Sequence, residues 1–199
     1  MKVTIILAHP NPQSFNHAIA RTVLTCLSRN GHEPYSHDLY AERFDPVLPY
    51  SEFEEGARLP ACLQQHCDEM RESEGIVIVH PNWWGQPPAI LKGWVDRVLR
   101  PGVAYRFIDG DEGEGVPNGL LRVRAAVVFN TSNTAAQREA EVFGDPLERL
   151  WRDCVFSLCG VRFFFRRTFQ VVIKSSMAER RRWLLDVEEI VSEYFPRLA

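Results

Sequence analysis

The sequence predicts a doubly wound α/β fold, in which helices cover both faces of a parallel sheet. Three short apolar segments, residues 3–7, 76–79 and 125–129, are continuous rather than alternating, which is typical of strands buried on both faces. Segments with helical spacing lie between them, and strands that alternate with helices indicate right-handed parallel crossovers. At 199 residues, the chain is expected to form a single domain over residues 1–199.

The other elements follow from apolar spacing and from residues typical of helix ends. Asp145 and Pro146 have the residue types of an N-cap and a first helical position, and Ser176 and Glu179 have capping-box spacing. Gly31 is placed to end the first helix. The expected elements are strand 3–7, a helix through 19–27, a weaker strand at 33–39, helix 61–73, strand 76–79, a helix through 90–99 opened by Pro87 and Pro88, strand 125–129, a helix from 146 to Gly160, a strand within 161–173 and a last helix through 183–194.

Composition and charge favour small-molecule partners. The formal net charge is -3, which disfavours a nucleic-acid binder. The first apolar run is too short for a signal peptide or a membrane span, so we expect a cytoplasmic protein that does not insert into membranes. The five cysteines match no common metal spacing and are interpreted as free buried thiols. The acidic stretch 109–115 lacks the ligand spacing of a calcium loop, and no metal site is expected.

The loop at residues 8–16 leads from the first strand into the first helix. Free N–H groups and the positive dipole end of a helix start favour a phosphate there, and Ser14 and Asn16 add hydrogen-bonding side chains. His9 is close enough in sequence to approach the same anion. Neither a G-x-G-x-x-G turn nor a Walker sequence is present, which disfavours a Rossmann or P-loop nucleotide site. The alternative is an N-capped helix without a ligand.

Two further loops follow buried strands and would meet the first loop at the carboxyl edge of the sheet. Residues 80–88 contain Trp83 and Trp84, which offer an apolar wall for a planar ligand, and Asn82, which offers polar contacts. Residues 130–134 carry five hydrogen-bonding side chains suited to the edge of a heteroaromatic ring. The alternatives are simple loop packing for the first of these and an N-capping turn for the second.

These segments resemble the NAD(P)H:quinone oxidoreductase family of flavodoxin-fold proteins, of DT-diaphorase type. The similarity spans most of the chain and is weakest in its last third. The matching motifs are AHPNPQSFN (8–16), DLYAERFDPV (38–47), PAILKGW (88–94), GVAYRF (102–107) and NTSNT (130–134).

The resemblance implies a flavodoxin-like five-stranded parallel sheet of order 2-1-3-4-5 and a homodimer. It implies a non-covalent flavin, FAD or FMN, and NAD(P)H as the electron donor. Hydride would pass from NAD(P)H to the flavin and then both electrons to a quinone-like acceptor in the same pocket, a ping-pong order. Because the flavin carries the redox chemistry, no catalytic side chain is required.

The resemblance also assigns residues by position. The first loop would hold the flavin phosphates, and the other two loops would line the ring. The cofactor-binding residues so implied are His9, Ser14, Phe15, Asn16, Pro81, Asn82, Trp83, Trp84, Gly85, Thr131, Ser132 and Asn133. Tyr105 and Phe107 stand where the partner subunit contributes an aromatic pair over the substrate. Phe143, also expected at the substrate, replaces the His of a Tyr/His relay in mammalian members, so proton handling is expected to differ.

Two other functions fit the same resemblance. Some relatives are flavin-bearing regulatory subunits of potassium efflux systems. Six arginines have two interpretations, a docking surface for such a partner or a solvated face, and the solvated face is the simpler of the two. These arginines are Arg162, Arg166, Arg167, Arg180, Arg181 and Arg182. Azo- or nitro-reduction on the same flavin is the other alternative, and the sequence does not separate it from quinone reduction.

Overall fold

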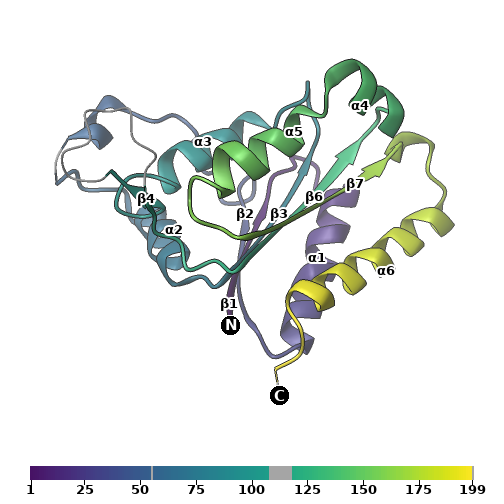
Figure 1. Ribbon diagram of the computed structural model, residues 1–199, viewed down its shortest axis with the longest axis horizontal. Coiled ribbons are helices and arrows are strands. Elements are labelled where there is room, and N and C mark those ends of the chain that lie inside the picture. The colour runs from purple at the N-terminus through teal and green to yellow at the C-terminus, as the bar shows by residue number, and fades with distance from the viewer. Residues whose placement is uncertain (55, 108–117, 199) are drawn as a thin grey trace.

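The computed structural model describes residues 1–54, 56–107 and 118–198, so the acidic stretch 109–115 lies outside the described residues. Five parallel strands form one sheet in the order β2-β1-β3-β6-β7 (Figure 1). They are β1 (Lys2–Leu7), β2 (Glu33–Asp38), β3 (Gly75–Pro81), β6 (Ala125–Ser132) and β7 (Phe163–Gln170). The short antiparallel pair β4 and β5 lies outside this sheet. Without that pair, the strand order is 2-1-3-4-5, and the expected flavodoxin-like sheet is confirmed.

Alternate residues of the central strands face two separate apolar cores. In β3, Ile76 and Ile78 lie in one core, whereas Val77 and Val79 lie in the other. The helices that cover the two cores lie on opposite sides of the sheet in Figure 1. They are α2 (Ala61–Glu72), α3 (Ala89–Val98) and α5 (Pro146–Arg149) over the first core, and α1 (Phe15–Arg29) and α6 (Met177–Tyr194) over the second.

The ends of the helices follow the expected local chemistry at three places. The Ser14 hydroxyl caps α1 by accepting a hydrogen bond from His17 N at 3.3 Å, and Gly31 lies just past its end with φ of +82°. Ser176 and Glu179 form a complete capping box at the start of α6. The predicted helix end at Gly31 and the predicted capping box are confirmed.

Asp145 and Pro146 lie at the predicted N-cap and first helical positions of α5, but the Asp145 side chain does not cap the helix. Asp145 has a left-handed backbone with φ of +45° and makes no capping hydrogen bond. Its side chain instead forms an ion pair with Arg166 of β7. Helix α5 ends at Arg149 and continues as a π-helix, η2 (Leu150–Phe156).

Several short elements have no apolar period and were not expected. Helix α4 has a single buried residue, Glu139, so no stripe of apolar residues marks it in the sequence. The unexpected elements are α4 (Ala136–Phe143), β4 (Tyr105–Arg106), β5 (Asn118–Gly119) and the 3₁₀ helices η1 (Tyr50–Phe53) and η3 (Val172–Lys174).

Gly93 allows two of the family motifs, residues 88–94 and 38–47, to pack closely against each other. A Cβ atom at Gly93 would lie 2.2 Å from the carbonyl oxygen of Pro46, so only glycine allows α3 to approach the loop after β2 this closely. PAILKGW and DLYAERFDPV are therefore in direct backbone contact.

The remaining sequence expectations concern the membrane and the cysteines. No helix among the described residues is long and apolar enough to cross a membrane. All five cysteines are free thiols, as expected, and Cys26, Cys67 and Cys159 are buried. Cys62 and Cys154 are exposed, so the expectation of burial is wrong for these two.

Candidate functional site

A pocket of about 1060 Å³ lies at the carboxyl ends of β1, β3 and β6. The parallel register aligns these ends, with Leu7 opposite Val79 and Pro81 opposite Thr131. The three loops predicted from the sequence therefore line one cavity. The predicted site residues that line it are His9, Ser14, Phe15, Asn16, Pro81, Asn82, Trp83, Trp84, Gly85, Thr131, Ser132, Asn133 and Phe143.

One end of the pocket is the start of α1. Asn16 is buried there, and its Nδ2 donates a hydrogen bond to Thr131 Oγ1 at 2.8 Å. Its Oδ1 is buried without any partner. A hydroxyl can donate as well as accept, so turning the amide over lets Thr131 donate to Oδ1 and leaves Nδ2 free for an anionic ligand. This end therefore fits a phosphate.

Three of the predicted residues, Phe15, Ser132 and Asn133, line the pocket but also use their side chains to hold the surrounding structure. The Phe15 ring packs on Phe169 and Trp183, with ring centroids 5.9 and 5.7 Å apart, so this ring belongs to the core between α1 and α6. Ser132 Oγ accepts from Thr134 N at 3.0 Å, and Asn133 Oδ1 accepts from Ile173 N at 3.0 Å. These side-chain oxygens fix the loop after β6.

The loop after β3 is held by Asn82. Its backbone N–H donates to Thr131 O at 2.7 Å, and its Oδ1 accepts from Gly85 N at 3.0 Å. Gly85 has φ of +72°, which favours glycine. The loop presents Trp83 and Trp84, which are 41% and 100% exposed, so a broad apolar surface stands open to solvent at the pocket mouth.

The buried side chain of His80 holds the start of this loop through hydrogen bonds. His80 Nδ1 donates to Pro81 O at 2.8 Å, and its Nε2 accepts hydrogen bonds from Trp151 Nε1 and Asn130 Nδ2. Burial lowers the pKa of His80 to about 4. His80 is thus a neutral imidazole at physiological pH, with its tautomer set by its neighbours.

His9 is the histidine that faces the pocket. Its Nδ1 accepts a hydrogen bond from Asn11 N at 3.1 Å, and its ring lies 6.1 Å from that of Trp83. Burial lowers the pKa of His9 below its usual value. This histidine therefore acts mainly as a neutral hydrogen-bonding group at pH 7.

Helix α4 and the start of α6 complete the pocket with residues that sequence reasoning missed. Glu139 is 7% exposed and accepts a hydrogen bond from Asn82 Nδ2 at 3.0 Å. Arg180, in the first turn of α6, donates to Ser175 Oγ and Val172 O. The structure adds Asn11, Gln13 and Thr134 from the predicted loops, and Glu139, Val142, Pro146, Val172, Ile173 and Arg180 from outside them.

Tyr105 and Phe107 do not line this pocket. They lie at and just after β4, with ring centroids 5.6 Å apart in an edge-to-face arrangement. Phe107 is 56% exposed. The pair is thus separate from the site of its own chain, and a role at a partner's site stays a prediction.

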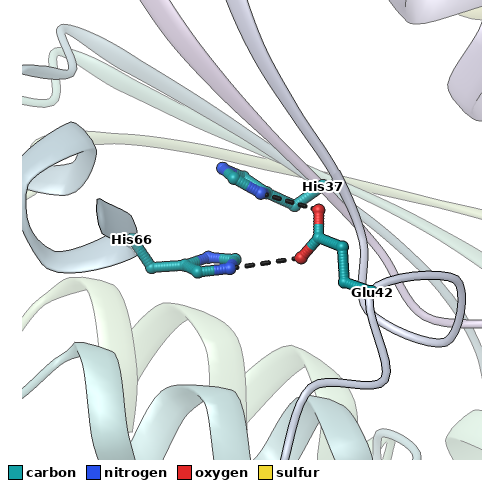
Figure 2. A group of neighbouring side chains, drawn as sticks. All are labelled: His37, Glu42 and His66. Carbon is teal, nitrogen blue, oxygen red and sulfur yellow. Dashed lines mark hydrogen bonds and ion pairs between the residues drawn. The ribbon is translucent and has the colours of Figure 1, made fainter. Parts of the chain in front are cut away.

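A second polar cluster lies away from the pocket, where His37, Glu42 and His66 point toward one another (Figure 2). One ligand-type atom from each lies within 4.8 Å of the others, a composition suited to zinc. However, Trp94 Nε1 only donates, and it donates to His66 Nδ1 at 3.1 Å. A neutral His66 therefore carries its proton on Nε2 and presents that N–H to Glu42, 3.2 Å away.

The cluster is accordingly held together by hydrogen bonds, and by ion pairs where His37 is protonated. His37 contacts Glu42 through Nδ1 and Glu69 through Nε2. Burial disfavours the charged His37, but these two hydrogen bonds raise its pKa overall. Burial likewise opposes ionisation of Glu42, yet hydrogen bonds from His37 and His66 lower its pKa to about 2. The result ties β2, the loop after it and α2 together.

Comparisons with known proteins agree with this geometry. A family model described as a flavodoxin-like fold matches residues 1–184. An uncharacterized NAD(P)H oxidoreductase of Haemophilus influenzae is 34% identical over 165 residues, covering 81% of this chain and 79% of that protein. Human ribosyldihydronicotinamide dehydrogenase (quinone) is 31% identical over 174 residues, covering 75% of this chain and 72% of that protein.

Two solved structures agree with these sequence relatives on the fold. The crystal structure of a protein from Streptococcus mutans UA159 matches with a TM-score of 0.82 and 30% identity, covering 97% of this chain and 100% of that chain. The NAD(P)H:quinone oxidoreductase from Methanothermobacter marburgensis matches in fold, with a TM-score of 0.78 at 24% identity over 96% of this chain and 95% of that one. The chain therefore belongs to the NAD(P)H:quinone oxidoreductase family of flavodoxin-fold proteins.

Proposed function

We propose that this chain is a flavin-dependent NAD(P)H oxidoreductase, a single flavin-binding domain that passes two electrons to quinones or similar acceptors. The pocket at the carboxyl edge of the sheet carries the proposal, because it joins hydrogen-bond donors at a helix start to broad apolar walls. A bound flavin would supply the redox chemistry by taking hydride from NAD(P)H and returning both electrons to the acceptor. Donor and acceptor would use the same pocket in turn, which gives ping-pong kinetics.

The phosphate end would be formed by the first loop. The N-terminal N–H groups of α1 carry the positive end of the helix dipole, and they lie beside Asn16 and Thr131. The unpartnered Oδ1 of Asn16 supports this assignment, since the amide can be reoriented to donate into the pocket. Arg180 adds a cation to the lining and supports binding of a phosphorylated ligand.

The ring end would be formed by the loop after β3 together with α4. Trp83, Trp84 and Phe143 supply aromatic surface, and Asn82 fixes the loop that carries the two tryptophans. His80 and His9 have lowered pKa values, so neither supplies a proton readily near pH 7. Backbone dipoles would then stabilise charge on a reduced ring.

A homodimer would close the site. Trp84 is fully exposed and Phe143 is 50% exposed, so apolar surface at the pocket mouth is uncovered in a single chain. Tyr105 and Phe107 lie outside the pocket of their own chain and are available to a partner's site. A two-fold arrangement would let each chain cover the other.

The alternative of a transporter accessory protein has less support. Its docking surface would need solvated arginines, but the Arg166 side chain is 8% exposed and paired with Asp145 and Glu148. Arg180 is bound to backbone and Ser175. Reduction of azo or nitro compounds would use the same pocket and stays open as a further activity of one flavin site.

The experiment is to identify the pigment of the purified protein. We expect a yellow protein whose heat-released flavin runs as FMN or as FAD on chromatography. Asn16→Asp, which puts an anion beside the phosphate site, should weaken flavin binding by tenfold or more. The same change at exposed Asn118 should leave it unaltered. A colourless protein that takes up neither flavin would refute the proposal.

A further inference from the structure

The pocket contains one carboxylate that the proposed flavin chemistry does not use. Glu139 is the only buried residue of α4 and lines the cavity. Its Oε1 accepts a hydrogen bond from Asn82 Nδ2 at 3.0 Å. Among the described residues, Glu139 takes part in no ion pair, and its Oε2 accepts no hydrogen bond. A buried carboxylate that keeps one oxygen unused at a cavity wall is available to a ligand.

Asn82 fixes the position of this carboxylate. Both ends of the Asn82 amide are engaged, because its Nδ2 donates to Glu139 while its Oδ1 accepts from Gly85 N at 3.0 Å. Its backbone N–H donates to Thr131 O at 2.7 Å. Glu139 is therefore held against the same loop that carries the two tryptophans.

The charged groups around Glu139 do not neutralise it. Arg138, its neighbour on α4, lies over the Phe143 ring at 5.5 Å. Asp145 is paired with Arg166, so that carboxylate is compensated. Arg180 lines the same pocket and keeps its positive charge, but its guanidinium donates to Ser175 and Val172, and no ion pair joins it to Glu139 among the described residues. His9 has a lowered pKa and adds little positive charge near pH 7.

Apolar side chains line the same cavity as the carboxylate. Val142 and Phe143 on α4, Pro146 after it and Trp83 with Trp84 all line the cavity with Glu139. Such walls suit a planar acceptor, and they also lower the local polarity, so that a charge on the acceptor feels Glu139 more strongly than it would in water.

We propose that Glu139 is the specificity-determining residue of the acceptor site, and that its carboxylate selects uncharged or cationic planar acceptors over anionic acceptors of the same shape. This inference rests on the proposed function for the identity of the ligand as an acceptor. The discrimination itself is a property of the pocket wall, and it is measurable without turnover.

The test compares two ligands that differ in charge and little in shape. Naphthalene-2-sulfonamide and naphthalene-2-sulfonate would be titrated into the flavin-loaded, oxidised protein, without NAD(P)H, by calorimetry. We expect the wild-type protein to bind the neutral compound about tenfold more tightly, because the carboxylate of Glu139 and the sulfonate are like charges that repel each other in a partly solvated pocket. The preference should shrink in 0.5 M NaCl, because salt screens the repulsion.

Substitution separates charge from structure. Glu139→Gln keeps an oxygen that accepts from Asn82 but removes the charge, so sulfonate affinity should rise about tenfold while sulfonamide affinity stays within about twofold. Glu141→Gln is the matched control, because it removes the same charge from an exposed position on the same helix, where Glu141 accepts a hydrogen bond from Gln137. That variant should behave as the wild type.

The inference is overturned if Glu139→Gln leaves sulfonate affinity unchanged or weakens both ligands alike, and also if Glu141→Gln produces the same shift. With substrates, kcat/KM for 1,4-naphthoquinone and its 2-sulfonate should show the same preference in the wild type and the same loss of preference in Glu139→Gln. If the chain bound no flavin, the proposed function would be wrong, but the inference about Glu139 could still be tested. The ligand pair would then be titrated into the protein without flavin, where the same shift would still support the role of Glu139.

Discussion

The buried imidazole of His80 makes stability depend on pH in a calculable way. Its pKa falls from 6.5 to about 4 on folding because burial disfavours the cation. The folded pKa is below the unfolded one, so the stabilisation is complete above about pH 6.5 and declines as the pH falls toward 4. At pH 5 an unfolded His80 is almost fully protonated, whereas the folded residue is about one tenth protonated, and integration from pH 7 to pH 5 gives about 2 kcal/mol.

The assay is urea unfolding at pH 7, 6 and 5 for the wild type and for His80→Gln, whose side-chain oxygen can still accept the Trp151 and Asn130 hydrogen bonds. The difference in unfolding free energy between the two proteins isolates the contribution of His80. This subtraction is necessary because His37 has a raised pKa, so its own contribution to stability is lost as the pH rises. We expect the wild-type advantage to shrink by about 2 kcal/mol between pH 7 and pH 5. A constant difference over this range would refute the assignment of a neutral, buried His80.

Three further results are expected. Gly93→Ala should destabilise the fold by about 1–3 kcal/mol, because its Cβ would overlap the Pro46 carbonyl, and an unchanged Tm would contradict the close contact. The rate of flavin bleaching by NADPH should be nearly flat between roughly pH 6 and 8, since His9 and His80 have lowered pKa values; a tenfold sigmoidal fall, abolished by replacing either, would show a histidine relay. Light scattering should give the mass of a dimer, and a fully active monomer would exclude a site completed by Tyr105 of a partner.

The sheet and the site loops were predictable because their signals are local. The apolar runs of β1, β3 and β6 are continuous, and parallel strands place their carboxyl ends together, so the loops holding Asn16, Asn82 and Thr131 had to meet. The capping box of α6 is likewise a signal four residues long. Each of these inferences needs no knowledge of distant contacts.

The features that were missed depend on contacts between distant residues. Asp145 looks like an N-cap, but Arg166, 21 residues later, takes its carboxylate. Glu139 has no sequence signal, because α4 carries no apolar stripe and its one buried residue is polar. The network of His37, Glu42, His66 and Trp94 gathers residues from four separate segments. Only the folded chain shows that these groups are partners.

The most direct test of the proposed function is to measure the two half-reactions separately under anaerobic stopped flow. NADPH or NADH alone should bleach the bound flavin, and a quinone alone should restore its colour in the protein that has been reduced and freed of nucleotide. Each step should be at least as fast as steady-state turnover, as a ping-pong order requires. Bleaching that needs the quinone to be present, or a flavin that the nucleotide never reduces, would contradict the account.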